Sequence, residues 1–409
     1  MGTQHTGVQA TTTFLRHRSR KDSKPARGEM ESASLIIGTL DGSTFVAYLL
    51  SIDIALFYFA TLTLKLIVLF VFRREVSFSA LERNLPFIFL LLIAEFIGTV
   101  VWGDGNLLRV VGFCCSLAIS LLFVSRKYFS SLAWISIINA ALYLTYWKMG
   151  FIGNEWGRFY YFGNSHPNLG SEIFYGAAVA ALLARDSRVV LLSLPLTVCA
   201  IILMQGRAAL LGCVVLYGGY AVRALFRLSR MRKALIGVVF FPIAAIIVLL
   251  YADAALDYFR SLFLLDDVHR GVGTGFVGRD ERWSSAIAVF MENPFLGGGS
   301  SYSDRLNLPS AHSFSLWALA SYGIIGIVLL GILGKRAIQS AFSSSSMAIA
   351  LISWAPLFIL NDRFINLNIY PFIIYVAILS SAKGPLGLAT DQRAGAPPRF
   401  LVASNRKFN

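Results

Sequence analysis

Long apolar runs, separated by short polar connections, fill most of the chain between residues 34 and 383. Each comes near the length of about 20 residues that a helix needs to cross a bilayer. The runs cover 34–50, 54–72, 86–101, 106–124, 129–147, 168–184, 189–204, 208–222, 235–251, 312–333, 347–360 and 368–382. No alternating ten-residue pattern typical of a membrane barrel is present. The pattern therefore predicts an all-α, polytopic membrane protein with about twelve transmembrane helices.

The first apolar stretch, 34–72, is interrupted at Asp41-Gly42 and again at 51–53. It is either two tightly turned spans or one span that follows a surface segment. A basic tail precedes it and Arg73, Arg74 and Arg83 follow it. If both basic groups lie on the same side of the membrane, an even number of crossings separates them. This argument favours two spans.

Composition and charge agree with this class. The chain of 409 residues is 56% hydrophobic and 14% charged, and its mean hydropathy is +0.66. Soluble domains carry about 25% charged residues. The formal net charge is +14, and the basic residues fall on alternate connections, as the positive-inside rule requires. These connections hold Arg126-Lys127, Arg185 with Arg188, the group from Arg223 to Lys233, Lys335-Arg336 and the C-terminal tail. The residues are scattered and form no single basic face, which argues against a nucleic-acid partner.

Both ends of the chain are polar and basic. Residues 1–33 are poor in apolar side chains, which predicts a disordered cytoplasmic tail, and 384–409 is expected to be a second cytoplasmic tail. The transmembrane domain is expected to span 34–383. No metal-binding spacing occurs among the four cysteines, which lie in apolar runs and are interpreted as small packing residues.

The remaining connections, which we expect on the outside, are 148–167, 205–207, 252–311 and 361–366. They hold six residues that suit an anionic ligand: His166, Arg207, Arg279, Arg282, His312 and Arg363. The planar fork of arginine matches phosphate oxygens. Such a cluster on this side favours an anionic ligand at the outer leaflet, for example a lipid diphosphate. The alternative is that each arginine binds lipid headgroups or extends its charged end to the interface.

The long connection 252–311 carries two further signals. Apolar residues recur at helical spacing in 280–292, which predicts a helix in the membrane–water interface that Asn293-Pro294 ends. His312 follows Pro309-Ser310, so we expect it in the first turn of a membrane helix with Ser310 as the capping residue. A helix N-terminus favours a neutral imidazole, which suits a general base acting on a sugar hydroxyl. The alternative is a structural histidine at a helix end.

Two other sequence patterns are weaker evidence about function. Gly273, Gly275 and Gly278 formally make GxGxxG, but no strand or βαβ unit surrounds them, so we reject a dinucleotide site. The spans contain the acids Asp41, Asp53 and Glu95, with Glu172 near an outer end. Acids inside a membrane suggest a second hypothesis, a transporter or flippase for an anionic lipid or solute that uses Asp53, Glu95 or Arg109. A non-catalytic membrane scaffold is a third.

Four ordered segments between about 160 and 335 resemble motifs of the O-antigen ligase and polymerase superfamily. They are Gly163-Asn164 with His166-Pro167-Asn168; Gly206-Arg207 with Leu210-Leu211; Gly278-Arg279 with Trp283 and Asn293-Pro294-Phe295-Leu296-Gly297; and His312-Ser313 followed, nine residues later, by Gly323-Ile324-Ile325-Gly326. Each segment is weak alone, and the order of the set is more specific. Asparagine commonly follows the histidine in this family, whereas Ser313 follows it here.

The resemblance implies a bacterial inner-membrane glycosyltransferase with a GT-C-like helical fold, an active site facing the periplasm, and no metal or cofactor. Its substrates would be undecaprenyl-diphosphate-linked glycans. Polymerases add these to another repeat unit of O antigen or exopolysaccharide, whereas ligases transfer them to lipid A core in lipopolysaccharide. By the same resemblance, Arg207 and Arg279 would hold the diphosphate, and His312 would activate the acceptor hydroxyl. The remaining candidates on the outer side are expected to contribute to substrate binding. These are Arg282, His166, Asn168 and Arg363. Chain-length regulator and flippase proteins are the candidate partners.

Overall fold

The computed structural model describes residues 27–49, 54–73, 78–155, 158–159, 167–229, 279–360 and 369–380, together with 249–254 and scattered positions between these ranges. The helices are α2 (Arg27–Leu49), α3 (Ile54–Val71), α4 (Ser79–Trp102), α5 (Leu107–Leu122), α6 (Arg126–Lys148), α7 (Pro167–Ala184), α8 (Ser187–Met204), α9 (Arg207–Phe226), α11 (Arg279–Glu292), α12 (Tyr302–Arg305), α13 (Phe314–Ser343), α14 (Ser345–Leu360) and α15 (Ile369–Ser380). Within these ranges the strands are β1 (Asn154–Glu155) and β2 (Arg158–Phe159), which pair antiparallel with Asn154 opposite Phe159. The fold is therefore helical, as expected.

Helices coincide with eleven of the predicted apolar runs, and the run 235–251 is described only at scattered positions, all of them helical. α4, α6, α8, α9 and α13 are long and apolar enough to cross a membrane, and shorter apolar helices occupy 56–71, 107–122, 170–184 and 345–359. The stretch 34–72 forms two helices, α2 and α3, and that both cross the membrane stays a prediction.

The predicted tail needs one correction. α2 begins at Arg27 rather than after residue 33. Glu29 lies in the first turn, where a negative charge stabilises the helix N-terminus, and Ala33 is fully buried. Residues 27–33 are thus the first part of a packed helix.

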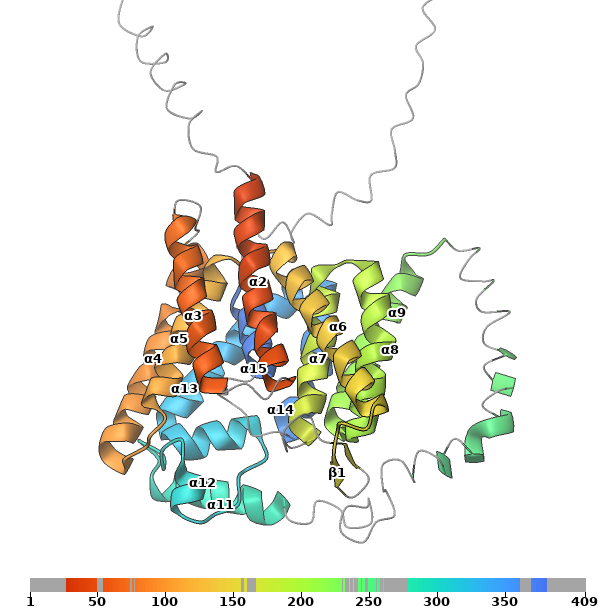
Figure 1. Ribbon diagram of the computed structural model, residues 1–409. Coiled ribbons are helices and arrows are strands. Elements are labelled where there is room, and N and C mark those ends of the chain that lie inside the picture. The colour runs from red at the N-terminus through yellow and green to blue at the C-terminus, as the bar shows by residue number, and fades with distance from the viewer. Residues whose placement is uncertain are drawn as a thin grey trace, which may run out of the picture.

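Two helices form the centre of the bundle (Figure 1). Residues 170–184 of α7 and 372–380 of α15 are buried all round. α15 packs against α5, α7 and α13, and α7 packs against α6, α8 and α9. A helix that is apolar on every side belongs in the interior, which explains the alanine-rich sequence of α7. The other helices surround this pair.

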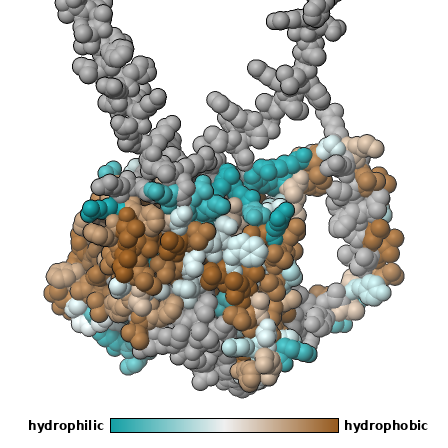
Figure 2. Space-filling model, turned by 45° about the horizontal axis from the view of Figure 1, so that its top comes forward, coloured by the Kyte–Doolittle hydropathy of each residue, from teal (hydrophilic) through white to brown (hydrophobic). Residues whose placement is uncertain are grey.

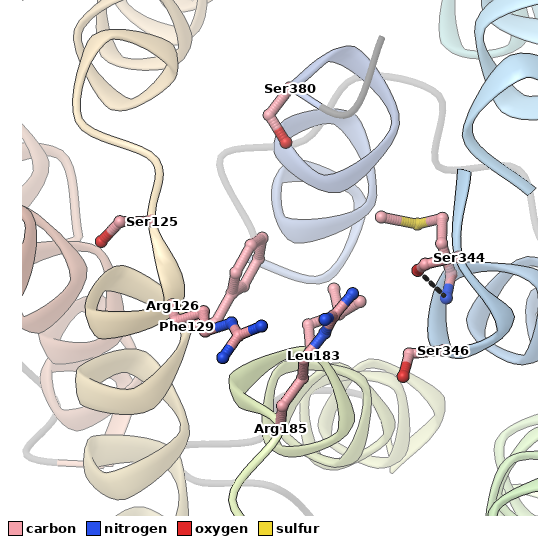
Figure 3. A pocket seen from close by; sticks show the side chains of 9 residues that line it. Ser125, Arg126, Phe129, Leu183, Arg185, Ser344, Ser346 and Ser380 are labelled. Atoms are coloured by element: carbon pink, nitrogen blue, oxygen red, sulfur yellow. Dashed lines mark hydrogen bonds between the residues drawn. The ribbon is translucent and has the colours of Figure 1, made fainter. Parts of the chain in front are cut away.

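The basic connections predicted to be cytoplasmic converge at one end of the bundle, the upper end in Figure 1. A pocket there is lined by residues from four elements: Ser125, Arg126, Phe129, Leu183, Arg185, Ser344, Ser346, Met347 and Ser380. In Figure 3 the guanidinium groups of Arg126 and Arg185 point into the same space. Figure 2 shows hydrophilic residues gathered along this end above apolar flanks. The distribution matches a membrane protein with one basic face.

A buried polar network that the sequence did not predict joins four helices. Asp41 of α2 forms an ion pair with Lys65 of α3, and both side chains are almost fully buried. Ser120 Oγ and Tyr128 OH each donate to Asp41 Oδ2 at 2.8 Å, while Lys65 Nζ donates to Ser116 Oγ at 2.6 Å. Since a buried charge is tolerated when it is paired and hydrogen-bonded, this network holds the α2–α3 pair against α5 and α6.

Candidate active site

α13 is broken near its start, at the end of the bundle opposite the basic connections. Gly323 has φ 56° and ψ −133°, a conformation that is accessible essentially only to glycine. The chain folds back so closely that a Cβ on Gly326 would lie 2.2 Å from the carbonyl oxygen of Ala318. The predicted span 312–333 is therefore two segments. Residues 314–322 lie across the bundle in Figure 1, and the rest of α13 runs along it.

The turn after α11 replaces the hydrogen bonds that the break removes. Backbone groups on both sides of Gly323 bond to residues 294–299: Gly298 N donates to Ala320 O at 2.7 Å, Gly299 N to Ser321 O at 2.9 Å, and Ile324 N to Pro294 O at 2.8 Å. Buried backbone groups need such partners. The Asn293-Pro294 motif and the Gly323–Gly326 motif, about 30 residues apart in sequence, are thus two halves of one packing unit.

His312 lies just before this broken helix, and its predicted setting was wrong. α13 begins at Phe314 with Ser313 as the N-cap residue, three residues later than the predicted cap Ser310. His312 itself has φ 45°, a left-handed conformation that is uncommon for non-glycine residues. Its side chain is half-buried. A backbone held in this region costs about 1–3 kcal/mol and is a feature often found at functional sites.

α11 docks beside His312 through its apolar face. Ala286 and Val289 are buried against Tyr302, Ala311 and Ala320 in a small second core. Ile287 and Met291 point outward and are exposed. The helix expected over 280–292 is present and ends before Asn293-Pro294. Its exposed apolar side suits a membrane–water interface.

The first turn of α11 brings two arginines close to the histidine segment. Arg282 Nη1 donates to the carbonyl oxygen of Ser310 at 3.3 Å, two residues before His312. Burial lowers the pKa of Arg279, and the neighbouring charge of Arg282 lowers it further. Two half-buried guanidinium groups therefore repel one another here. A bound anion would relieve that repulsion, and two arginine forks offer several donors to phosphate oxygens.

Arg207 and Asn168 lie at the same end of the bundle but belong to another part of the fold. Arg207 is the first residue of α9 and is exposed, and Asn168 is exposed in the first turn of α7. Gly206 brings α9 against α7, because a Cβ there would lie 2.1 Å from Ser171 Oγ. Ser171 Oγ in turn donates to the Asn168 carbonyl oxygen at 2.7 Å. Small residues thus set the position of Arg207.

Some of the predicted site residues lie in the described part of the structure, and others lie outside it. Arg282 contacts the segment that carries His312 through the Ser310 carbonyl oxygen, and Arg279 lies near enough to Arg282 to feel its charge, while Arg207 and Asn168 lie in the first turns of the neighbouring helices α9 and α7. His166, Arg363 and the rejected 273–278 glycine pattern lie outside the described residues. Among the described residues, no group of histidine, cysteine and acidic side chains could hold a metal ion.

Sequence reasoning missed the contribution of the α4–α5 connection, whose residues Asp104 and Asn106 contact Ser301 and Ser300. Glu95 was considered only as an acid in a span, and Asp104 was not considered. The available signal was Asp104 itself, a charged residue directly after Gly103, the left-handed residue that ends α4.

The bundle defines a helical, multi-pass membrane protein whose candidate site lies at one end, next to a broken helix. Residues 189–331 match the family described as O-antigen ligase. The match confirms, over these residues, the resemblance to the O-antigen ligase and polymerase superfamily, and it includes Arg207, Arg279, Arg282 and His312. No match is found among curated proteins. The family match supports a membrane enzyme that processes glycans.

Proposed function

We propose that this protein is a bacterial inner-membrane glycan polymerase that transfers undecaprenyl-diphosphate-linked repeat units to a growing lipid-linked polysaccharide. The observation that supports this most is a pair of half-buried arginines in the first turn of α11, of which Arg282 donates to the carbonyl oxygen of Ser310, two residues before His312. Lipid-linked donors carry a diphosphate next to the reacting sugar, so an enzyme for them needs cationic donors beside a base.

The orientation follows from charge. The basic connections gather at one end of the bundle and the candidate site lies at the other. Under the positive-inside rule the basic end faces the cytoplasm, so the site faces the periplasm. A donor held by a polyprenyl tail reaches a site at the outer membrane surface, which is where the exposed apolar side of α11 would lie.

The proposed reaction is a displacement at the anomeric carbon of the donor sugar. His312 takes the proton from a hydroxyl group of the acceptor sugar, and the resulting oxygen nucleophile forms the new glycosidic bond. The bond between the anomeric carbon and the diphosphate oxygen breaks, and undecaprenyl diphosphate leaves with the electron pair. The left-handed backbone at His312 fixes the direction from which the ring approaches the acceptor.

The arginines stabilise the leaving group. Charge accumulates on the diphosphate as the bond breaks, and fixed guanidinium groups in a partly dehydrated site lower the energy of that state. Arg279 and Arg207 are assigned this role. Arg282, Asn168, His166 and Arg363 are assigned to substrate binding. The reaction as written requires no metal or cofactor.

A reconstituted assay tests this proposal. Purified protein in lipid is given lipid-linked repeat units extracted from the host, alone and then with lipid A core, and products are separated on a gel. A ladder from the donor alone, lost in His312→Ala, supports a polymerase. Transfer only in the presence of lipid A core assigns the ligase reaction instead. Wild-type product levels from His312→Ala would show that the histidine is not the base.

The transporter hypothesis makes a different prediction in the same membranes. Uptake driven by a proton gradient that survives His312→Ala would favour it. Of the acids on which it depends, Glu95 accepts hydrogen bonds at both oxygens, from Ser300 and Tyr322, and Asp53 lies outside the described residues. The hydrogen bonds of Glu95 favour a structural role over a relay.

A further inference from the structure

A fully buried carboxylate, Glu95, lies near the end of α4 and outside the segment that matches the ligase family. Its oxygens contact two separate segments. Ser300 Oγ donates to Oε1 at 2.7 Å, and Tyr322 OH donates to Oε2 at 3.0 Å. Ser300 lies twelve residues before His312, and Tyr322 lies ten residues after it. One side chain thus holds both flanks of the candidate base.

Contacts from the α4–α5 connection also hold Ser300 next to Glu95. Asn106 Nδ2 donates to Ser300 Oγ at 3.0 Å. The buried carboxylate of Asp104 accepts hydrogen bonds from the Ser301 hydroxyl and, at 3.5 Å, from the Ser301 backbone amide. The α4–α5 connection therefore holds the loop that carries Ser300 from more than one point.

A cation–π contact closes the same interface. The Arg305 guanidinium lies over the Trp102 ring, 4.4 Å from its centroid, and donates to the Gly298 carbonyl oxygen. Gly298 also donates to Ala320 across the break in α13. The end of α4, the loop 298–305 and the segment 314–322 are consequently one connected unit.

We propose that Glu95 is a positioning residue for the glycosyl transfer: it clamps Ser300 and Tyr322 and thereby fixes His312 relative to the arginines of α11. This inference rests on the proposed function. Glu95 touches neither substrate nor reacting atoms and acts through hydrogen bonds, not through its charge. A displacement of a reacting group by about 1 Å can lower a rate about 100-fold, so such a clamp matters for catalysis.

Substitutions at Glu95 separate the clamp from a charge effect. Glu95→Ala removes both bonds, and we expect kcat to fall about 100-fold while KM for host-extracted lipid-linked repeat units stays within about threefold. Glu95→Gln keeps an acceptor for Ser300, and its amide can donate to the Tyr322 hydroxyl oxygen. We therefore expect it to retain activity within about threefold of wild type. Glu82→Ala and Glu82→Gln, at the exposed opposite end of the same helix, are the matched controls.

Hydrogen exchange without substrate tests the clamp independently of the reaction. In Glu95→Ala we expect the amides of Gly298, Gly299 and Ile324 to exchange about tenfold faster, while those of α7 are unchanged. Should Glu95→Ala fail to accumulate, Ser300→Ala, which removes one partly buried hydroxyl, is expected to show the same two effects.

Two results overturn the inference. If Glu95→Gln is as slow as Glu95→Ala, the negative charge is what matters; if exchange at the three amides is unchanged, Glu95 holds nothing in place. Neither result touches the proposed function, which depends instead on the loss of transfer in His312→Ala.

Discussion

At the scale of single residues, the role of charge at Arg279 can be distinguished from the role of the guanidinium geometry. A lysine at this position would keep the positive charge but lose the planar fork that binds two phosphate oxygens at once. We expect Arg279→Lys to lower the rate of glycan transfer about 100-fold, the cost typical of losing one preorganised donor at a developing negative charge. Transfer is measured with reconstituted protein and host-extracted donor.

The control for this change is Arg188→Lys, an exposed arginine at the basic end of the bundle. It makes the same chemical change away from the candidate site, so transfer by this variant is expected to equal wild type. Equal losses in both variants would remove the support for a phosphate-binding role of Arg279.

Gly323 gives a second prediction for a single residue. Alanine there must adopt φ 56°, and its Cβ would lie 2.6 Å from the carbonyl oxygen of Pro294. We expect Gly323→Ala to lower stability by about 1–3 kcal/mol through backbone strain, with clash adding to this, and to abolish transfer. Thermal unfolding in detergent measures the first effect and the gel assay the second.

The matched control lies in the same helix. Gly331 has open space around its Cβ position, so Gly331→Ala is expected to raise stability by about 0.5–1 kcal/mol and to leave transfer unchanged. The two substitutions are chemically identical and opposite in expected sign. A Gly323→Ala protein as stable as wild type would show that the packing of residues 294–299 does not require glycine at the break.

At the scale of elements, the α2–α3 pair depends on one buried ion pair. Lys65→Met leaves Asp41 buried without its cation, which is expected to cost about 3–5 kcal/mol. Replacing both members, as in Asp41→Leu with Lys65→Met, removes the unpaired charge and is expected to restore most of the stability. The midpoint of thermal unfolding, followed by size-exclusion chromatography, compares the two variants. A double variant less stable than Lys65→Met would contradict this account.

The physical origin of each sequence signal explains which elements could be predicted and which could not. Apolar runs mark helices because a bilayer requires about 20 apolar residues per crossing, so α2 to α9 were recognisable. The same signal hides the break at Gly323, since the apolar run continues through it. It also hides the Asp41–Lys65 pair, which only the packing of two helices brings together. For the same reason, motifs located Arg279 and His312, but not the partners of Glu95.

At the scale of the whole molecule, the two ends of the bundle should differ in access from outside the cell. In a variant without native cysteines, Glu292→Cys places a thiol at the site end and Lys127→Cys places one at the basic end, and both positions are exposed. We expect a membrane-impermeant maleimide to label the first in intact spheroplasts and the second only after lysis. The reverse pattern would place the candidate site in the cytoplasm.

The central helices have a consequence for exchanging parts between related enzymes. α7 and α15 form the middle of the bundle, yet both lie outside the matched segment 189–331. That segment carries the candidate catalytic residues but not the central helices against which it packs. A chimaera made by exchanging 189–331 would therefore pack the helices of one enzyme against the central helices of another. Recombination that keeps α7, α15 and the helices packed against them from one parent leaves the centre of the bundle intact.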